Sequence, residues 1–284
     1  MIYFCHIPRT SGTSISHAVY AAFHKDLKIL SKPELEQFDP YTNKKINKTD
    51  YQSFLKECHL KIDFFYGHHF SSPYIKPYSE NLETFSIIRS PLERSISEFY
   101  YINNNTNYEN WKNFQIYEIK NYLLNKCSQT TNEHCLYLLA DYDWERMKKE
   151  RKDVQIFWFN TQGNQFHDSQ MTEDKISFEE ILQTIKKRNI KLSTLENRIY
   201  LLNELEVSLN KIKKTNIFLD KNLKVNERLH LEERQEFNNP ESFFSQQEIE
   251  KFKTLNSLDY QLYNYVKDHE TKTGRCLTPD DILF

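Results

Sequence analysis

Short apolar runs that end abruptly at polar segments constrain this chain more than any other feature of its sequence. Residues 2–5 (IYFC) form the first run, and residues 63–66 and 84–88 form two more. Runs of this length are typical of strands that are buried on both faces, as in a parallel sheet. Residues 14–23 carry apolar side chains at helical spacing, so the first strand, a tight loop and a helix follow one another directly.

The rest of the chain continues this alternation of strands and helices. Further helices are predicted from Pro91 onward and over residues 115–127, 133–140, 178–187, 196–211 and 246–269. Residues 154–159 resemble another strand, and residues 25–60 a polar, Lys-rich connection with some helix. The side chains expected to face inward from the 196–211 helix are Ile199, Leu202, Leu205 and Leu209. The pattern predicts an α/β fold with a mostly parallel sheet flanked by helices, in a single domain over residues 1–284.

The bulk composition excludes some classes of function. A net charge of −2 over 284 residues does not favour a nucleic-acid-binding protein, because such proteins are usually basic. Five widely spaced cysteines without a C-x-x-C pair favour isolated thiols over a disulfide framework or a zinc site. No apolar run approaches the ~20 residues of a membrane span, and no secretion signal is visible, so a cytoplasmic protein is expected. A membrane anchor outside this sequence is still compatible with that expectation.

The loop over residues 6–14 (HIPRTSGTS) combines small residues, one glycine and one arginine. Small residues let backbone N–H groups close around phosphate oxygens, and Arg9 adds a fixed positive charge. The loop therefore predicts an anion site at a strand-to-helix junction, with an ordinary capped turn as the alternative. The nucleotide-hydrolase motif G-x-x-x-x-G-K-[ST] is absent, because Thr13 follows Gly12.

A second strand-end segment covers residues 87–97 (IIRSPLERSIS). Ser90 and Pro91 favour a helix start, with serine as the N-cap and proline at the first helical position. Arg89 stands where the strand ends, and its guanidinium could pair with a phosphate through two hydrogen bonds. A capped helix with a surface arginine is the alternative if this segment is taken alone.

Together, the two segments resemble the donor-binding motifs of the carbohydrate sulfotransferases that use 3′-phosphoadenosine 5′-phosphosulfate (PAPS), such as the heparan sulfate 2-O- and 6-O-sulfotransferases. The first is similar to the family's 5′-phosphosulfate loop, H-I-P-K-T-G-G-T-S, with Arg9 in place of lysine and Ser11 in place of the first glycine. The second is similar to the 3′-phosphate motif, R-[DS]-P-x-x-R-x-x-S. The resemblance covers roughly the first hundred residues and implies a P-loop NTPase-like sulfotransferase fold.

This resemblance assigns a role to each matching residue. The residues that would bind the 5′-phosphosulfate are Pro8, Arg9, Thr10, Ser11, Gly12, Thr13 and Ser14. Arg89 and Ser97 would bind the 3′-phosphate, and Arg94 would hold that loop by hydrogen bonds. The family's lysine helps charge to build up on the leaving phosphate. Arg9 can do this electrostatically but is not expected to donate a proton, because the pKa of arginine is above about 12.

A general base is expected just after the second apolar run. An acceptor hydroxyl must lose its proton as it attacks sulfur, and imidazole titrates in the useful pH range. His68 resembles the position of the catalytic histidine in the hexuronic 2-O-sulfotransferases. His69 could orient His68 or line the acceptor cleft, and a structural role is the alternative for either. His6 is expected to brace the first loop from behind.

The second half of the chain carries weaker signals. Lys224 and Arg228 lie where relatives carry a late loop that closes over the donor, and both could contact its phosphates. Residues 258–263 (LDYQLY) resemble the family's terminal helix and are interpreted as packing residues. The Lys clusters at residues 44–48 and 186–191 could face an acidic glycan, or could simply be solvated surface.

The expected function is transfer of the sulfuryl group of PAPS to a hydroxyl of a carbohydrate acceptor, which releases adenosine 3′,5′-bisphosphate (PAP) without a metal ion. Another hydroxyl acceptor, the identity of the modified hydroxyl and the oligomeric state remain open. A non-catalytic nucleotide- or glycan-binding relative, and a P-loop-like kinase that uses ATP, are the alternative functions.

Overall fold

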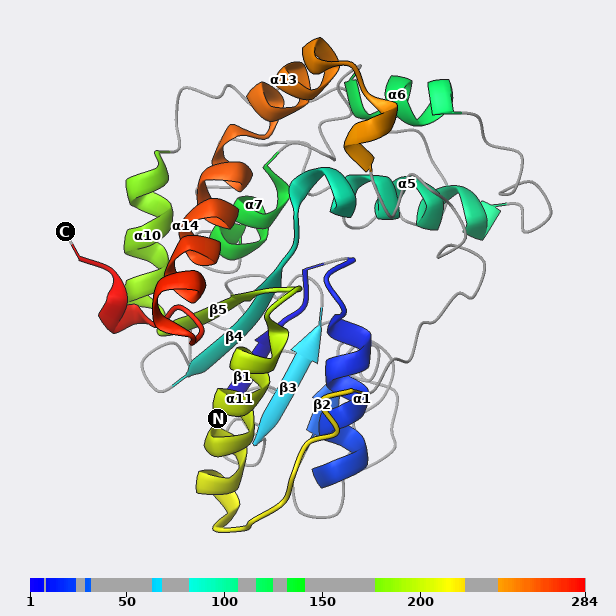
Figure 1. Ribbon diagram of the computed structural model, residues 1–284. Helices are drawn as coiled ribbons and strands as arrows, with labels where there is room; N and C mark the ends of the chain where they lie inside the picture. The colour runs from blue at the N-terminus through cyan, green and yellow to red at the C-terminus, as the bar shows by residue number, and fades with distance from the viewer. Residues whose placement is uncertain are drawn as a thin grey trace, which may run out of the picture.

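In the computed structural model of the chain, five strands pair in parallel to form one sheet (Figure 1). Their order is β2-β3-β1-β4-β5, and their bounds in that order are Ile29–Ser31, Phe64–Gly67, Ile2–Cys5, Glu83–Ile88 and Ile190–Thr194. The structure describes residues 1–7, 9–23, 29–31, 63–67, 82–106, 116–124, 132–140, 177–222 and 240–283, and all structural statements concern these residues. The predicted α/β architecture with a parallel sheet and flanking helices is confirmed.

Strand β1 lies in the middle of this sheet, between β3 and β4. Its last residue, Cys5, is paired with Gly67 of β3 and with Ser86 of β4. The hydroxyl of Ser86 also donates a hydrogen bond to the carbonyl oxygen of Cys5, at 2.8 Å. Because the strands are parallel, the carboxyl ends of β1, β3 and β4 lie at the same edge of the sheet, where ligands bind in folds of this class.

The helices agree closely with the periodicity of the sequence. They are α1 (Gly12–Phe23), α5 (Pro91–Thr106), α6 (Ile116–Leu124), α7 (Glu133–Ala140), α10 (Phe178–Lys187), α11 (Arg198–Lys213), α13 (Gln246–Leu255) and α14 (Ser257–Thr273). Two short 3-10 segments, η4 (Pro240–Phe243) and η5 (Pro279–Asp281), complete the described elements. The predicted strand at residues 154–159 lies outside the described residues. No helix of the described part is long and apolar enough to cross a membrane.

Two apolar cores cover the two faces of the sheet. Helices α1 and α11 pack on one face against Phe4 and Phe85, while α7, α10 and α14 pack on the other against Leu192. Adjacent residues of β4, Ile87 and Ile88, enter different cores, as the alternation of a pleated strand requires. The sheet is therefore covered by helices on both sides.

A third apolar cluster lies beyond the carboxyl edge of the sheet. It joins α5, α6 and α13 through side chains that include Ile96, Ile119 and Phe252. In Figure 1 these three helices lie past the end of β4, which leads into α5. The end of β4 thus stands between the sheet and this helical layer.

Two strands were not predicted from the sequence. β2 falls in the segment that was expected to be a polar connection with some helix. β5 was not predicted because Lys191 interrupts its apolar pattern. Ile190 and Leu192 are buried. Between them, Lys191 Nζ lies 2.6 Å from Glu83 Oε1 and 3.1 Å from Glu204 Oε2. Lys191 therefore forms ion pairs with two neighbouring elements, and the suggestion that the cluster at residues 186–191 could face a glycan stays a prediction.

Two further expectations are corrected by the structure. The predicted single helix over residues 246–269 is two helices, because the chain turns at the buried Asn256 between α13 and α14. Ile199, which was expected to face inward, is 41% exposed, and Leu201 is buried instead. The buried residues of α11 form a stripe centred on Leu205, and Ile199 lies about 120° away from it around the helix.

A buried glutamate in α14 holds the turn that follows β5. One Glu270 oxygen accepts hydrogen bonds from the Ser193 hydroxyl and, at 2.8 Å, from the backbone N–H of Thr194. The other accepts from the Thr194 hydroxyl at 2.6 Å and from the Asn197 amide at 3.0 Å. A buried carboxylate is stable only when donors satisfy it in this way, so the turn and α14 depend on each other.

The substitution Glu270→Ala is expected to lower the free energy of unfolding by about 3 kcal/mol, because it leaves several buried donors without an acceptor. Urea denaturation followed by tryptophan fluorescence measures the loss. Lys272→Ala, at an exposed position of the same helix, should change stability by less than about 0.5 kcal/mol. Equal effects of the two substitutions would contradict this account of the turn.

Candidate functional site

The loop between β1 and α1 has an unusual backbone. Arg9 and Ser11 both have φ of 66°, in the left-handed region that residues other than glycine seldom adopt. The hydroxyl of the buried Thr10, between them, donates a hydrogen bond to the carbonyl oxygen of Ile7 at 2.8 Å. Turns of this kind bring backbone N–H groups toward a common point and form anion-binding concavities.

Gly12 is required in this loop for space. A methyl group at its Cα would lie 1.9 Å from Cδ2 and 2.2 Å from Cγ of His6. The imidazole of His6 therefore packs directly against the start of α1. This contact agrees with the expectation that His6 braces the loop.

The loop leads directly into the N-terminus of α1. Ile15 donates the first hydrogen bond of the helix, to the carbonyl oxygen of Ser11 at 3.2 Å. The N–H groups of Gly12 and Thr13 come before Ile15 in the chain, so they have no acceptor within the helix. They lie at the end of the helix where the dipole is positive. Loop and helix together have the arrangement that binds phosphate in many α/β proteins.

A hydrogen bond connects this loop with the second motif. Nε of Arg9 donates to Oγ of Ser97, in the second turn of α5, at 3.0 Å. The two residues are 88 positions apart in the chain, and each was expected from its own motif to bind the donor. The fold therefore brings the two motifs into contact.

Arg89 follows the last residue of β4. Its side chain is 18% exposed, and its Nε lies 3.1 Å from Oε2 of Glu93, one turn along α5. Helix α5 begins at Pro91, as predicted, and Arg94 donates its N–H to the carbonyl oxygen of Ser90 at 2.9 Å. Arg89 therefore stands at the same edge of the sheet as the Arg9 loop.

Arg94, in the first turn of α5, is buried and forms an ion pair with Glu133 of α7. Burial acts to lower the pKa of Arg94, but the surrounding carboxylates of Glu133, Glu98 and Asp259 outweigh it and raise the pKa above its ordinary value. Arg94 thus fastens α5 to α7. This ion pair with α7 differs from the expected role, in which hydrogen bonds from Arg94 hold the loop.

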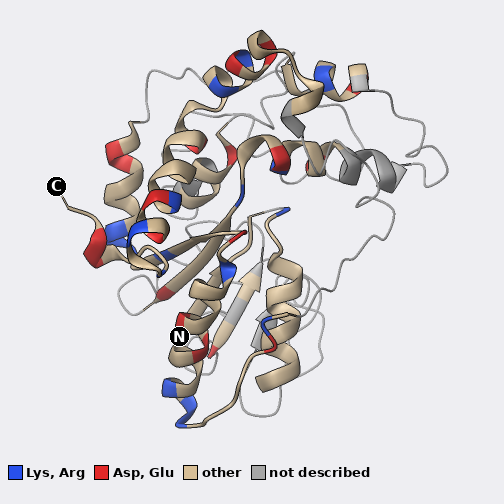
Figure 2. Ribbon diagram, viewed as in Figure 1, with Lys and Arg blue, Asp and Glu red and all other residues tan. Residues whose placement is uncertain are grey.

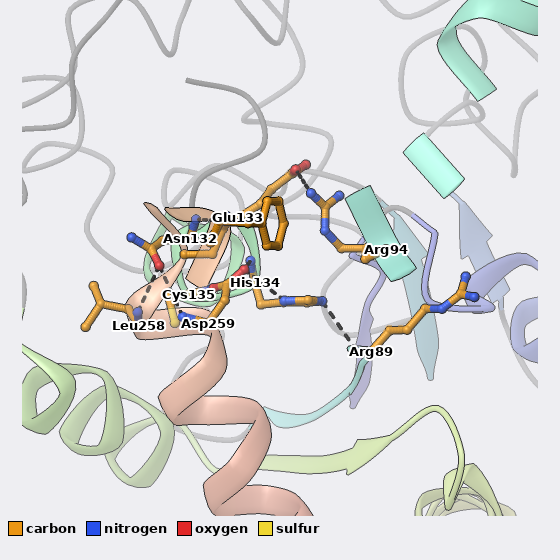
Figure 3. A network of polar contacts seen from close by, with 10 residues as sticks. Arg89, Arg94, Asn132, Glu133, His134, Cys135, Leu258 and Asp259 are labelled. Carbon is orange, nitrogen blue, oxygen red and sulfur yellow. Dashed lines mark hydrogen bonds and ion pairs between the residues drawn. The ribbon is translucent and has the colours of Figure 1, made fainter. Parts of the chain in front are cut away.

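Helices α7 and α14 cap each other, which the sequence did not reveal (Figure 3). Asp259 of α14 accepts the backbone N–H groups of His134 and Cys135, each at 2.9 Å. In return, Oδ1 of Asn132 accepts the N–H groups of Leu258 at 2.9 Å and Asp259 at 3.2 Å. The first N–H groups of any helix lack an acceptor within that helix. Here a residue at the start of each helix accepts hydrogen bonds from the first N–H groups of the other helix.

The interpretation of residues 258–263 as packing residues was therefore incomplete. Leu262 does enter the core, but Asp259 is a buried carboxylate with three donors on α7. An aspartate near a helix N-terminus normally predicts a cap of its own helix. Only the three-dimensional structure places its partners, more than a hundred residues earlier in the chain.

Several residues expected at the site lie outside the described residues. They are Pro8, His68, His69, Lys224 and Arg228. Their roles as donor ligands or as the general base stay predictions. The residues that the structure brings together are those of the Arg9 loop, Ser97 and Arg89.

Charge and metal-binding groups in the described part set further limits on the site. No group of three or more His, Cys, Asp or Glu side chains among these residues could hold a metal ion. In Figure 2, basic and acidic positions are interspersed along the described helices rather than gathered by sign. Arginines, backbone N–H groups and a helix N-terminus are the groups here that favour an anion.

A comparison with models of protein families finds none that matches this sequence, and a comparison with curated proteins finds no significant match.

The substitution Gly12→Ala is expected to lower the free energy of unfolding by about 1–3 kcal/mol, because the new methyl group overlaps the His6 ring. In the background of His6→Ala the same change should cost less, since the ring is gone. A double-mutant cycle measured by urea denaturation should therefore give a coupling energy above about 0.5 kcal/mol. Simple additivity would show that the two residues do not contend for the same space.

Proposed function

We propose that this protein is a PAPS-dependent sulfotransferase that transfers the sulfuryl group to a hydroxyl of a carbohydrate acceptor. The proposal combines the resemblance of two sequence motifs with their placement in an α/β fold. Both motifs follow neighbouring parallel strands, at the edge of the sheet where nucleotides bind in such folds. One donor molecule, with its 3′-phosphate and 5′-phosphosulfate on the same ribose, could then span both motifs.

The hydrogen bond between Arg9 and Ser97 carries the proposal. Each residue belongs to a different motif, and Arg9 Nε lies 3.0 Å from Ser97 Oγ. A site that binds both the 5′-phosphosulfate and the 3′-phosphate of one ribose requires this proximity. The contact therefore supports a common ligand more strongly than either motif alone.

The Arg9 loop would bind the 5′-phosphosulfate. Left-handed φ at Arg9 and Ser11, and the start of α1 at Gly12, provide backbone N–H donors suited to phosphate and sulfate oxygens. The fixed charge of Arg9 would stabilise the negative charge that develops on the leaving phosphate. A metal ion is not required for this arrangement.

Arg89 would read the 3′-phosphate. Glu93 accepts from its Nε, which leaves the two terminal nitrogens of the guanidinium as the donors for a phosphate. Arginine binds phosphate with two parallel hydrogen bonds, so it provides direction as well as charge. Ser97 would add its hydroxyl beside Arg9.

In the proposed reaction the acceptor oxygen attacks sulfur in line with the leaving group. A bond forms between that oxygen and sulfur, and the bond from sulfur to the 5′-phosphate oxygen breaks with its electron pair, which releases PAP. His68 would take the proton of the acceptor hydroxyl as general base. His69 would orient His68 or line the acceptor cleft.

The clearest competing function is a non-catalytic relative that binds nucleotide or glycan, because Arg9 stands where the family has lysine. A kinase that uses ATP is a second competitor. Binding of PAP without turnover over a broad panel of sugar acceptors would favour the first. Magnesium-dependent binding of ATP in preference to PAP would favour the second.

Arg89→Ala is expected to weaken the binding of PAP by about 10- to 100-fold, because charged hydrogen bonds to the 3′-phosphate are lost. Binding of adenosine 5′-monophosphate, which lacks that phosphate, should change little. Isothermal titration calorimetry measures both constants, and Lys211→Ala on the outer surface of α11 controls for the loss of one positive charge. Equal losses for the two nucleotides would show that Arg89 does not read the 3′-phosphate.

Arg9→Ala is expected to lower kcat by about 100- to 1000-fold. The removal of one hydrogen-bond donor that stabilises transition-state charge has an effect of this size in other enzymes. Arg9→Lys restores the residue of the resembling family and should keep at least the activity of the parent protein. The measurement is the release of PAP from PAPS in the presence of sugar acceptors. Full activity in Arg9→Ala would remove Arg9 from the catalytic proposal.

A further inference from the structure

His134, at the start of α7, is buried completely and contacts the end of β4. Its Nδ1 lies 2.9 Å from Oδ2 of Asp259. On the other side of the ring, Nε2 accepts a hydrogen bond from the backbone N–H of Arg89 at 3.4 Å, near the upper limit for such a bond. The imidazole therefore bridges the last long helix and the residue proposed to read the 3′-phosphate.

The chemistry of the neighbours fixes the tautomer of this ring. Nε2 can accept from a backbone N–H only in the neutral ring, and burial, which lowers the pKa of His134 against the opposing effect of Asp259, favours the same form. The pKa of Asp259 is below its ordinary value because the contacts with His134 and Cys135 outweigh the effect of burial. A carboxylate only accepts hydrogen bonds, so the proton of the ring is on Nδ1 and the lone pair is on Nε2.

The charged groups around His134 come from three elements. Asp259 belongs to α14, Arg94 to α5, and Arg89 to the end of β4. Both arginines oppose protonation of the ring, which keeps Nε2 available as an acceptor. The group that donates to Nε2 is the backbone N–H of Arg89.

We infer that the Asp259–His134 pair positions Arg89 for recognition of the 3′-phosphate. This inference rests on the proposed function. His134 is a positioning residue: it holds the main chain of Arg89, and Glu93 holds the side chain through Nε. Figure 3 shows the imidazole directed at the Arg89 main chain, while the Arg89 side chain extends away from it.

The position of Arg89 explains why a single main-chain contact matters. Arg89 is the junction between β4 and α5, where strand pairing has ended and the helix has not begun. Its N–H would otherwise have no partner in either element. A rotation of this peptide moves the guanidinium at the end of a long side chain, and with it the direction of the two terminal nitrogens.

Two substitutions of His134 separate its positioning role from its packing. Asparagine can keep the contact with Asp259, and glutamine can keep the contact with the Arg89 N–H. In His134→Asn the amide can still donate to Asp259 but is too short to reach Arg89. In His134→Gln the longer side chain can still accept from the Arg89 N–H. The full-length protein is titrated with PAP and with adenosine 5′-monophosphate by calorimetry.

His134→Asn is expected to weaken PAP binding by about threefold to tenfold, the worth of one hydrogen bond, with little change for adenosine 5′-monophosphate. His134→Gln should stay within about twofold of the parent protein for both nucleotides. Urea denaturation of each variant measures the loss of stability separately from the ratio of the two affinities. Equal weakening of both nucleotides, or none, would overturn the inference.

A measurement on the unaltered protein covers the case in which His134→Asn does not fold. With ¹⁵N-labelled histidine, the NMR spectrum should place the proton of His134 on Nδ1, and PAP should shift the Nε2 resonance while adenosine 5′-monophosphate leaves it in place. A proton on Nε2, or the same response to both nucleotides, would also overturn the inference. A parent protein that binds the two nucleotides equally would instead refute the proposed function.

Discussion

The buried carboxylate of Asp259 is the group on which the arrangement beyond the sheet depends. Burying a charge is costly unless donors compensate for it, and three donors of α7 do so here. These hydrogen bonds fix the first turn of α7. The same turn also forms the ion pair between Glu133 and Arg94 and accepts, at His134, the hydrogen bond from Arg89. A residue of the last long helix thereby sets the geometry at the point where β4 ends.

Parallel pairing of β1 with β4 makes this geometry relevant to a ligand. The register places Cys5 beside Ser86, so β4 extends two residues beyond the end of β1 and the segments after both strands begin at the same edge of the sheet. Arg9 can therefore reach Ser97 of α5, although the residues are far apart in the chain. The site consists of two segments with their own local structure, and the sheet determines the distance between them.

Local features of the site were predictable, whereas its long-range contacts were not. The buried run before Arg9, and Pro91 at the first position of α5, depend only on neighbours in sequence. β5 was missed because Lys191 is accommodated by two glutamates from other elements. The role of Asp259 was missed for the same reason, since its donors belong to a distant helix. His68 and His69 remain predictions from the sequence.

The two departures from the family motif have a physical meaning in this loop. Ser11 replaces a glycine and still has a left-handed φ, so the chain tolerates a conformation that costs a residue with a side chain about 1–2 kcal/mol. Arg9 replaces a lysine, and its Nε provides a donor in addition to the charged end of the side chain. That donor binds the Ser97 hydroxyl, which can still donate its own proton to a phosphate oxygen. Arginine therefore connects the two halves of the site through Nε, a donor separate from its two terminal nitrogens, whereas the three donors of a lysine share one nitrogen.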